Sequence, residues 1–391
     1  MKLKITYLLC ISMTLAAWSQ YNQLSPNAEI SVLTVGPGTT LNDAFGHNAF
    51  RINDRASGLD IVFGYGEYDF DTPNFYLKFA QGKLNYKISK DNFREFYYQY
   101  VTYYNRTIEE QVLNLSGEQK QRLYEYLVNN YKPENRKYLY DFFYDNCATR
   151  IRDVVQIATN DNIEFTPPKN FEAKTFRQLI YEHTGRNNWG SFGIDLALGS
   201  VIDKKATPYE HMFLPKYIHE FFGNAELQTN DKLVKKSSVI YQQREQQHST
   251  GWLFSPIAIF SMLALVIGSI TYTDKKKKKQ SKWLDVALFG ITGLLGVGML
   301  LLWFATDHTA TANNYNLLWA VPLNLLVIGQ LLRPKVNNWF KRYLKFLIIM
   351  LCLMTFHWIV GVQTFAIGLI PLLVALAIRY VYLIYVYSGK K

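Results

Sequence analysis

Five long apolar runs fill the C-terminal third of this 391-residue sequence, and they restrict what the chain can fold into more than any other feature. A membrane-spanning helix needs about 20 mostly apolar residues in a row, whereas a soluble helix keeps a polar face. The sequence therefore predicts an all-α transmembrane domain of five helices over residues 251–391. The runs cover residues 252–272, 284–305, about 315–332, about 344–362 and about 365–387.

Basic residues mark one side of these runs. Lys and Arg cluster after the first, third and fifth runs and before the fourth, whereas the two loops on the other side contain none. Because cytoplasmic loops carry the excess of Lys and Arg, we expect the C-terminus inside and residues 20–250 outside the cytoplasm. Residues 20–250 hold 26 Lys and Arg against 28 Asp and Glu, so the formal charge of +11 comes from elsewhere. This distribution predicts a membrane partner and excludes a nucleic-acid-binding domain, whose basic residues would gather on its folded surface.

The N-terminus has the order of a secretory signal peptide. Two lysines precede a short apolar stretch, and small residues precede a predicted cut after Ser19. A membrane anchor is the alternative, but the apolar stretch is too short to span a bilayer comfortably. We therefore predict a signal peptide over residues 1–19, an exported domain over 20–250 and the membrane domain over 251–391.

The exported domain mixes strand-like and helix-like segments, which predicts the α+β class. Strands are expected where β-branched and aromatic residues lie between Gly, Pro, Asn or Asp. Ser116 and Gln119 form a capping box at one predicted helix start. The predicted strands are residues 30–35, 48–52, 60–65 and 108–115, and the predicted helices are residues 93–104, 117–131, 148–158 and 209–222.

Cys147 is the only cysteine that the exported domain keeps. Cys10 lies in the predicted signal peptide and Cys352 in a predicted membrane helix, so we expect no disulfide. A single thiol in an exported domain cannot be a structural staple, which favours a reactive cysteine. The alternative is a small buried hydrophobic residue.

Two short segments supply the other residues of a thiol site. Cys147 follows Asn146 at a predicted helix start, where N–H groups favour a thiolate and can receive an oxyanion, with Asn146 and Ala148 supporting that start. His47 opens a strand and is the candidate general base, and Asp60, opening the next strand, is the candidate that orients its ring. Each residue is also open to interpretation as an ordinary cap, turn or strand residue, and only the combination indicates catalysis. No metal or other cofactor is predicted.

Polar residues near the outward ends of the spans are candidates for contact with a substrate. Asp307 and His308 follow the second run, and His357 lies within the fourth. Ionisable residues at membrane depth are costly and therefore often functional. Interfacial loop positions and interhelical hydrogen bonds are the alternative interpretation.

The motifs resemble those of known families. A histidine on a strand followed by Asn-Cys opening a helix is similar to the circularly permuted NlpC/P60 branch of papain-like enzymes. The full set resembles more closely the Bacteroidetes-type lipoprotein N-acyltransferases, over about residues 25–220, and the five spans look like the membrane domain of that family. The motifs are Phe45-Gly46-His47, Tyr65-Gly66-Glu67-Tyr68-Asp69-Phe70, Pro73-Asn74-Phe75-Tyr76-Leu77-Lys78-Phe79, Gly82-Lys83-Leu84, Asn135-Arg136 and Tyr144-Asp145-Asn146-Cys147-Ala148-Thr149-Arg150.

This resemblance implies a fold, a site and substrates. It implies a permuted papain-like domain, the nucleophile Cys147 and the base His47, and it leaves the third residue open between Asp60 and other polar positions nearby. It also implies a phospholipid acyl donor, a lipoprotein acceptor, and an inner-membrane protein with its catalytic domain in the periplasm. Two alternatives stay open: a membrane-tethered cysteine peptidase or amidase acting on cell-wall peptides, and a non-catalytic envelope scaffold.

Overall fold

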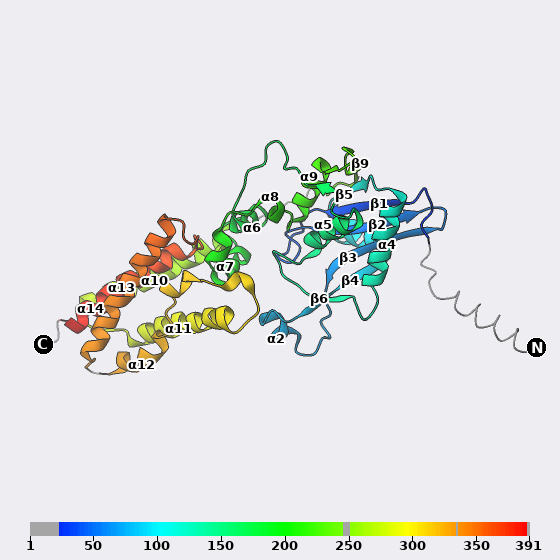
Figure 1. Cartoon of the computed structure of the whole chain (residues 1–391). Helices are drawn as coiled ribbons and strands as arrows, with labels where there is room; N and C mark the ends of the chain where they lie inside the picture. Colours follow the sequence, from blue (N-terminus) through cyan, green and yellow to red (C-terminus); the bar gives the residue numbers. More distant parts are fainter. Residues whose placement is uncertain (1–22, 245–250, 334, 389–391) are drawn as a thin grey trace, which may run out of the picture.

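The structure is a computed structural model that describes residues 23–244, 251–333 and 335–388 (Figure 1). A sheet flanked by helices forms the N-terminal part, and a bundle of long helices forms the C-terminal part. An α+β domain followed by an all-α membrane domain confirms the predicted fold class, while the permuted papain-like arrangement stays a prediction. The predicted signal peptide and its cleavage site lie outside the described residues.

Seven strands form one antiparallel sheet in the order β6-β4-β3-β2-β1-β5-β9. Along β1, Ile30 and Val32 belong to the core on one face of the sheet, and Leu33 and Val35 to the core on the other. This period of two buries both faces of the central strands. The strands are β1 (Glu29–Val35), β2 (His47–Asp54), β3 (Leu59–Glu67), β4 (Asn85–Asn92), β5 (Ile108–Leu113), β6 (Lys137–Leu139) and β9 (Val234–Tyr241), and β7 (Ile163–Glu164) pairs with β8 (Glu226–Leu227) in a second sheet.

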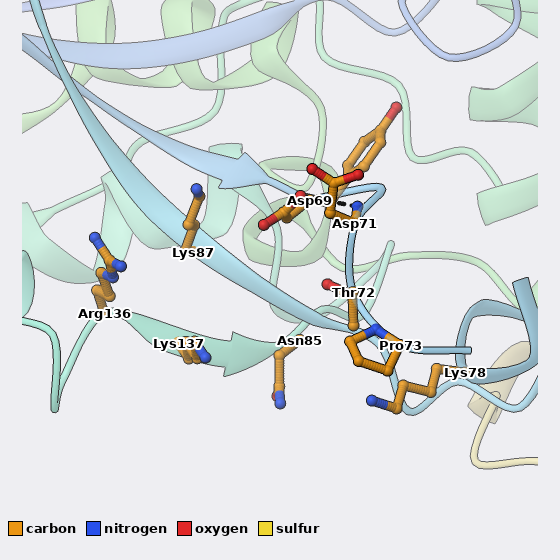
Figure 2. A pocket seen from close by; sticks show the side chains of 10 residues that line it. Asp69, Asp71, Thr72, Pro73, Lys78, Asn85, Lys87, Arg136 and Lys137 are labelled. Atoms are coloured by element: carbon orange, nitrogen blue, oxygen red, sulfur yellow. Dashed lines mark hydrogen bonds between the residues drawn. The ribbon is translucent and has the colours of Figure 1, made fainter. Parts of the chain in front are cut away.

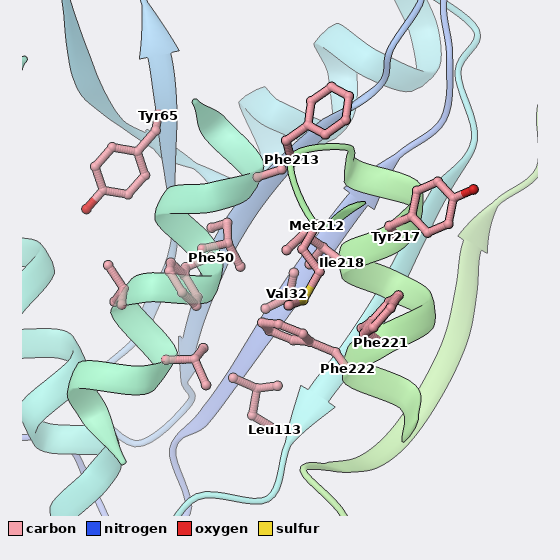
Figure 3. Close-up of a cluster of buried hydrophobic side chains, with 14 of the residues drawn as sticks. Val32, Phe50, Tyr65, Leu113, Met212, Phe213, Tyr217, Ile218, Phe221 and Phe222 are labelled. Atoms are coloured by element: carbon pink, nitrogen blue, oxygen red, sulfur yellow. The ribbon is translucent and has the colours of Figure 1, made fainter. Parts of the chain in front are cut away.

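Three helices cover one face of the large sheet. They are α4 (Gly117–Asn130), which begins with the predicted capping box, α5 (Cys147–Ala158) and α9 (Pro215–Asn224). Figure 3 shows Val32 of the sheet and Phe222 of α9 in the core between them. The apolar face of α5 packs across β2 and β3, so the start of α5 is fixed relative to the start of β2.

The other face of the sheet is covered by a helix that changes its winding. Predicted helix 93–104 forms α3 (Phe93–Tyr97) and continues as a π-helical turn (Tyr98–Tyr103). Such turns frequently occur at functional sites. Here the turn places Tyr100 against His47.

A proline divides the predicted helix 209–222 into α8 (Pro208–His211) and α9. Pro215 starts the second helix, because a proline has no N–H to donate and its fixed φ suits a first helical position. The sequence patterns also miss three short helices, two of which begin with a capping box. These are α2 (Phe75–Ala80), α6 (Phe176–Thr184) and α7 (Trp189–Ala197).

Within the described chain, four helices are long and apolar enough to cross a membrane. The third predicted span differs from them, because it consists of a 3-10 turn (Tyr315–Leu318), a turn at Pro322, and the nine-residue α12. The helices are α10 (Pro256–Lys277), α11 (Lys282–Phe304), α12 (Asn324–Leu332), α13 (Asn338–Ile359) and α14 (Leu369–Ser388). The five predicted crossings are therefore four continuous helices and one broken segment.

The broken segment is held against α11 by close contacts. Gly296 of α11 lets the Ala320 carbonyl approach, since a Cβ on this glycine would lie 2.1 Å from that oxygen. Asn324 Nδ2 donates to Thr292 Oγ1 at 2.8 Å. Irregular backbone at membrane depth needs such partners, and small residues at helix interfaces allow them.

The sheet domain is docked directly on the ends of α11 and α13. Asn316 Nδ2, after α11, donates to the Asp195 carbonyl at 2.8 Å. The Thr364 N–H, after α13, donates to the Asp203 carboxylate at 3.1 Å. Buried Arg177 holds both acids, at 2.8 Å from Asp195 and 3.0 Å from Asp203. This network connects the two parts of the chain without relying on the linker.

Candidate active site

Cys147 is the first residue of α5, and the local sequence explains why the helix begins there. Asn146 caps the helix, with its Oδ1 accepting a hydrogen bond from the Ala148 N–H at 2.8 Å. The Nδ2 of Asn146 donates to the carbonyls of Phe142 and Phe213 at 2.7 and 2.8 Å. A capped and anchored helix start holds the cysteine backbone in one position.

The structure brings Cys147 and His47 together from distant parts of the sequence. His47 is the first residue of β2, and the N–H of the next residue, Asn48, lies close enough to the Cys147 sulfur to act on the pKa of the thiol. The N–H groups at the start of α5 also face the sulfur. The thiol therefore lies where the helix start meets the strand start.

Two glycines of β3 leave room for these side chains. A Cβ on Gly64 would lie 3.2 Å from His47 Nε2 and 3.2 Å from Ser89 Oγ. A Cβ on Gly66 would lie 3.9 Å from the Cβ of Cys147, and Gly66 has a φ of +97°, which L side chains rarely adopt. At these two positions, where no side chain is present, the backbone of β3 forms one wall of the site.

Arg106 is a buried cation beside the site that the sequence patterns did not single out. It is 5% exposed, and its Nε donates to the Gly36 carbonyl at 2.8 Å. Its guanidinium lies 5.2 Å from the ring centre of Tyr100, and that ring stacks on His47 with centroids 6.1 Å apart. In the described part of the chain, its Nη2 is buried without a hydrogen-bond partner. A buried donor without an acceptor is costly, so Nη2 is available to an anion.

The charge states follow from burial. Burial, together with the charge of Arg106, lowers the pKa of His47 to about 4. Burial raises the pKa of the Cys147 thiol above its usual value, against the opposing effects of the Asn48 N–H and of Arg106. The resting site at neutral pH therefore holds a neutral thiol and a neutral imidazole. This corrects the expectation that the helix start favours a resting thiolate, because desolvation outweighs the N–H groups.

Asp60 does not lie beside His47. It pairs with Asn53 near the far end of β2, whereas His47 begins that strand. Its carboxylate forms a two-pronged ion pair with Arg51, with both N···O distances at 2.8 Å. The prediction that Asp60 orients the His47 ring is wrong, since the antiparallel register separates them by most of a strand. Ser89 of β4, which pairs with Gly64, lies nearer to His47, because its Oγ and His47 Nε2 are both 3.2 Å from where a Cβ on Gly64 would be.

Asp307 and His308 contact α2. The N–H of Asp307 donates to the Gln81 carbonyl at 2.8 Å. His308 Nε2 lies 3.0 Å from the Phe79 carbonyl oxygen. These two predicted substrate-proximal residues therefore fasten α2 to the loop that follows α11.

His357, the third predicted substrate-proximal residue, lies near the end of α13. Its ring packs edge-on against Tyr315, with centroids 4.6 Å apart. Among the described residues, none of these three side chains (Asp307, His308 and His357) forms a hydrogen bond with His47 or Cys147.

Fold and site together define a multi-pass membrane protein whose α+β domain brings a cysteine and a histidine together. Residues 15–182 match the family model described as the Lnb N-terminal periplasmic domain, and residues 246–391 match the Lnb transmembrane domain. The chain belongs to the Lnb family, the Bacteroidetes lipoprotein N-acyltransferases, so its α+β domain is periplasmic and the family is one of membrane enzymes that modify lipoproteins. No curated protein and no solved structure matches the chain.

Proposed function

We propose that this protein is an inner-membrane lipoprotein N-acyltransferase that works through a thioester on Cys147. It moves an acyl chain from a membrane phospholipid to the N-terminal amine of a diacylglyceryl-cysteine lipoprotein. The observation that carries this proposal is the meeting of the Cys147 thiol, His47 and the Asn48 N–H in a domain docked on membrane helices. A thioester keeps the acyl group while the two substrates exchange, and it reacts readily with amines.

In the first displacement, the thiol proton passes to His47 as the sulfur attacks the ester carbonyl carbon. At rest the imidazole is neutral at physiological pH because its pKa is about 4, and a neutral imidazole has a nitrogen free to accept a proton. The C–S bond forms, the ester C–O bond breaks, and His47 returns the proton to the departing lysophospholipid oxygen. The free enzyme becomes an acyl-enzyme with a neutral histidine.

In the second displacement, the lipoprotein amine attacks the thioester carbonyl. His47 takes a proton from the attacking nitrogen, the C–N bond forms and the C–S bond breaks. The same proton then goes to the departing sulfur, which restores the thiol. The product is an amide, and neither step consumes another reactant.

Both displacements build negative charge on the carbonyl oxygen. The donors that this oxyanion would meet are the N–H groups around the sulfur and Nη2 of Arg106, which has no hydrogen-bond partner among the described residues. Removing one such donor from a buried site typically lowers the rate about 10²- to 10³-fold.

Proteoliposomes with labelled phospholipid test the proposal. We expect hydroxylamine-sensitive label on the wild-type protein, none on Cys147→Ala or His47→Ala, and normal label on Cys352→Ala, whose cysteine lies in α13. Mass spectrometry of lipoprotein N-termini should show that N-acylation needs the protein in cells. Equal label on Cys147→Ala, or unchanged N-acylation without the protein, would overturn the proposal. Release of cell-wall peptides by the wild type would support the peptidase alternative.

A further inference from the structure

A cavity lies away from the thiol, at the β4–β6 edge of the sheet. It has a volume of about 380 Å³ and lies between these strands and the loop that leads from β3 into α2 (Figure 2). Figure 2 shows basic side chains on the strand side and two carboxylates on the loop side. The charged lining residues are Lys78, Lys87, Arg136, Lys137, Asp69 and Asp71.

The hydrogen-bond donors that line the cavity are not all satisfied by the acceptors that line it. Asp69 already accepts a hydrogen bond from the Asp71 N–H at 2.9 Å. Lys87 forms an ion pair with Glu67 at 3.4 Å. In the part of the chain that the structure describes, Arg136 Nε is buried without any hydrogen-bond partner. Arginine beside lysines is the combination that proteins use to bind phosphate groups.

One wall of the cavity is formed by α2, a short helix with exposed apolar side chains. Lys78 belongs to α2, whose outer surface exposes Tyr76, Leu77 and Phe79 by 79%, 57% and 53%. The same short helix is fastened through Phe79 and Gln81 to the loop after α11. Aromatic and apolar side chains at the end of a membrane helix lie at the depth of the lipid headgroups. With α2 at this depth, the cavity behind it would lie at the level of the lipid phosphates.

A row of tyrosine rings leads from the cavity to the thiol. Tyr68 lines the cavity and packs edge-on against Tyr86, with centroids 5.4 Å apart. Tyr86 stacks on Tyr140 at 4.4 Å. Tyr140 and Cys147 lie on the same side of Gly66, at 3.6 and 3.9 Å from where its Cβ would be. A lipid held by its phosphate in the cavity would lay its glycerol and ester groups along these rings.

We propose that this cavity binds the phosphate of the phospholipid donor and that α2 forms its membrane-facing wall. This proposal rests on the proposed function in one respect, namely that the esters of the bound lipid point toward Cys147. Binding of the phosphate in the cavity does not depend on the reactivity of Cys147. It gives the donor a fixed headgroup position, which brings one ester to the thiol instead of leaving the lipid free to slide in the bilayer.

Binding of a soluble phospholipid to the full chain in maltoside micelles tests the inference. The probe is dihexanoylphosphatidylcholine, with dihexanoylglycerol as the analogue without phosphate. The pocket variant Lys87→Gln/Arg136→Gln/Lys137→Gln is compared with Lys120→Gln/Lys235→Gln/Lys236→Gln. The control variant removes as many charges, with Lys235 and Lys236 on β9 at the opposite edge of the sheet.

We expect the pocket variant to bind the phospholipid at least about tenfold more weakly than the wild type, and the control variant to bind like the wild type. Dihexanoylglycerol should not distinguish the three proteins. Lys137→Glu, a single reversal at an exposed side chain, should weaken phospholipid binding in the same direction if the triple variant does not fold.

Equal phospholipid binding by the pocket and control variants would overturn the inference. Inorganic phosphate that binds as tightly as the phospholipid would also overturn it, since the cavity would then be a general anion site. A wild-type protein that binds the phospholipid through this cavity but forms no thioester would refute the proposed function alone.

Discussion

Thr309, in the loop after α11, donates a hydrogen bond to the Asp141 carboxylate at 2.8 Å. Asp141 also accepts from the Phe143 N–H at 2.9 Å and so shapes the turn that leads into Cys147. The membrane domain thus contacts the turn that presents the proposed nucleophile. The same loop holds α2 through His308. The loop after α11 therefore contacts both α2 and the turn before Cys147, and it fixes the distance between them.

We expect Asp141→Ala to destabilise the protein more than Thr309→Val. The first change removes an acceptor of several hydrogen bonds and should cost roughly 1 to 2 kcal/mol, whereas the second removes one exposed bond and should cost about 0.5 kcal/mol. Thermal unfolding in detergent measures both. Equal losses would mean that the bonds within the turn contribute nothing.

The rate of thioester formation should stay constant as the pH is lowered to about 4. His47 must be neutral to accept the thiol proton, and its pKa of about 4 means that it becomes protonated only below that pH. A histidine with an ordinary pKa would lose activity near pH 6.5. Initial acylation rates between about pH 3.5 and 8 check this. An acid midpoint near 6.5 would contradict the burial of His47.

Arg106→Gln should slow acylation of Cys147 about 10²-fold, by removing a donor for the oxyanion. The loss of its charge should also raise the pKa of His47 and raise that of the thiol further. The acid limb should therefore move to higher pH, and iodoacetamide should alkylate Cys147 more slowly at a given pH. Arg106→Lys should keep part of both effects, and Arg94→Gln, at an exposed position of α3, is the control. An unchanged acid limb would show that Arg106 acts only on folding.

Asp60→Asn should leave acyl transfer within about twofold of the wild type, because Asp60 holds Arg51 and not His47. Ser89→Ala should lower the transfer rate several-fold, since Ser89 Oγ and His47 Nε2 lie beside the same point next to Gly64. Rates at saturating donor compare the two variants. A larger loss in Asp60→Asn would restore Asp60 as the orienting residue.

Replacing the exposed apolar residues of α2 should separate membrane contact from chemistry. In the variant Tyr76→Ser/Leu77→Ser/Phe79→Ser, transfer from vesicle phospholipid should fall at least about fivefold, because α2 no longer lies stably in the interface. Alkylation of Cys147 by iodoacetamide should stay normal. Val239→Ser, at an exposed position on the opposite edge of the sheet, is the matched control. Normal transfer from vesicles would show that α2 does not contact the bilayer.

The sequence alone was enough for features that depend on neighbouring residues. The membrane runs could be predicted because span length and flanking charge are local properties. The central strands followed from alternation and turn residues, and the helix start at Cys147 followed from Asn146, since a cap bonds only a few residues ahead. The prediction that Cys147 and His47 act together used the count of cysteines and the positions of two element starts, and the structure brings the two residues together.

The tertiary structure decided what depends on register and burial. Strand pairing put Asp60 far from His47, because β2 and β3 pair antiparallel and the start of β3 therefore lies beside the end of β2. Arg106 comes from a loop between a helix and a strand, so only long-range packing reveals that it lies beside the site. The helix α2 and the broken third span owe their shapes to contacts with the loop after α11 and with Gly296. The neutral resting thiol is also a tertiary effect, because desolvation depends on every group packed around the sulfur.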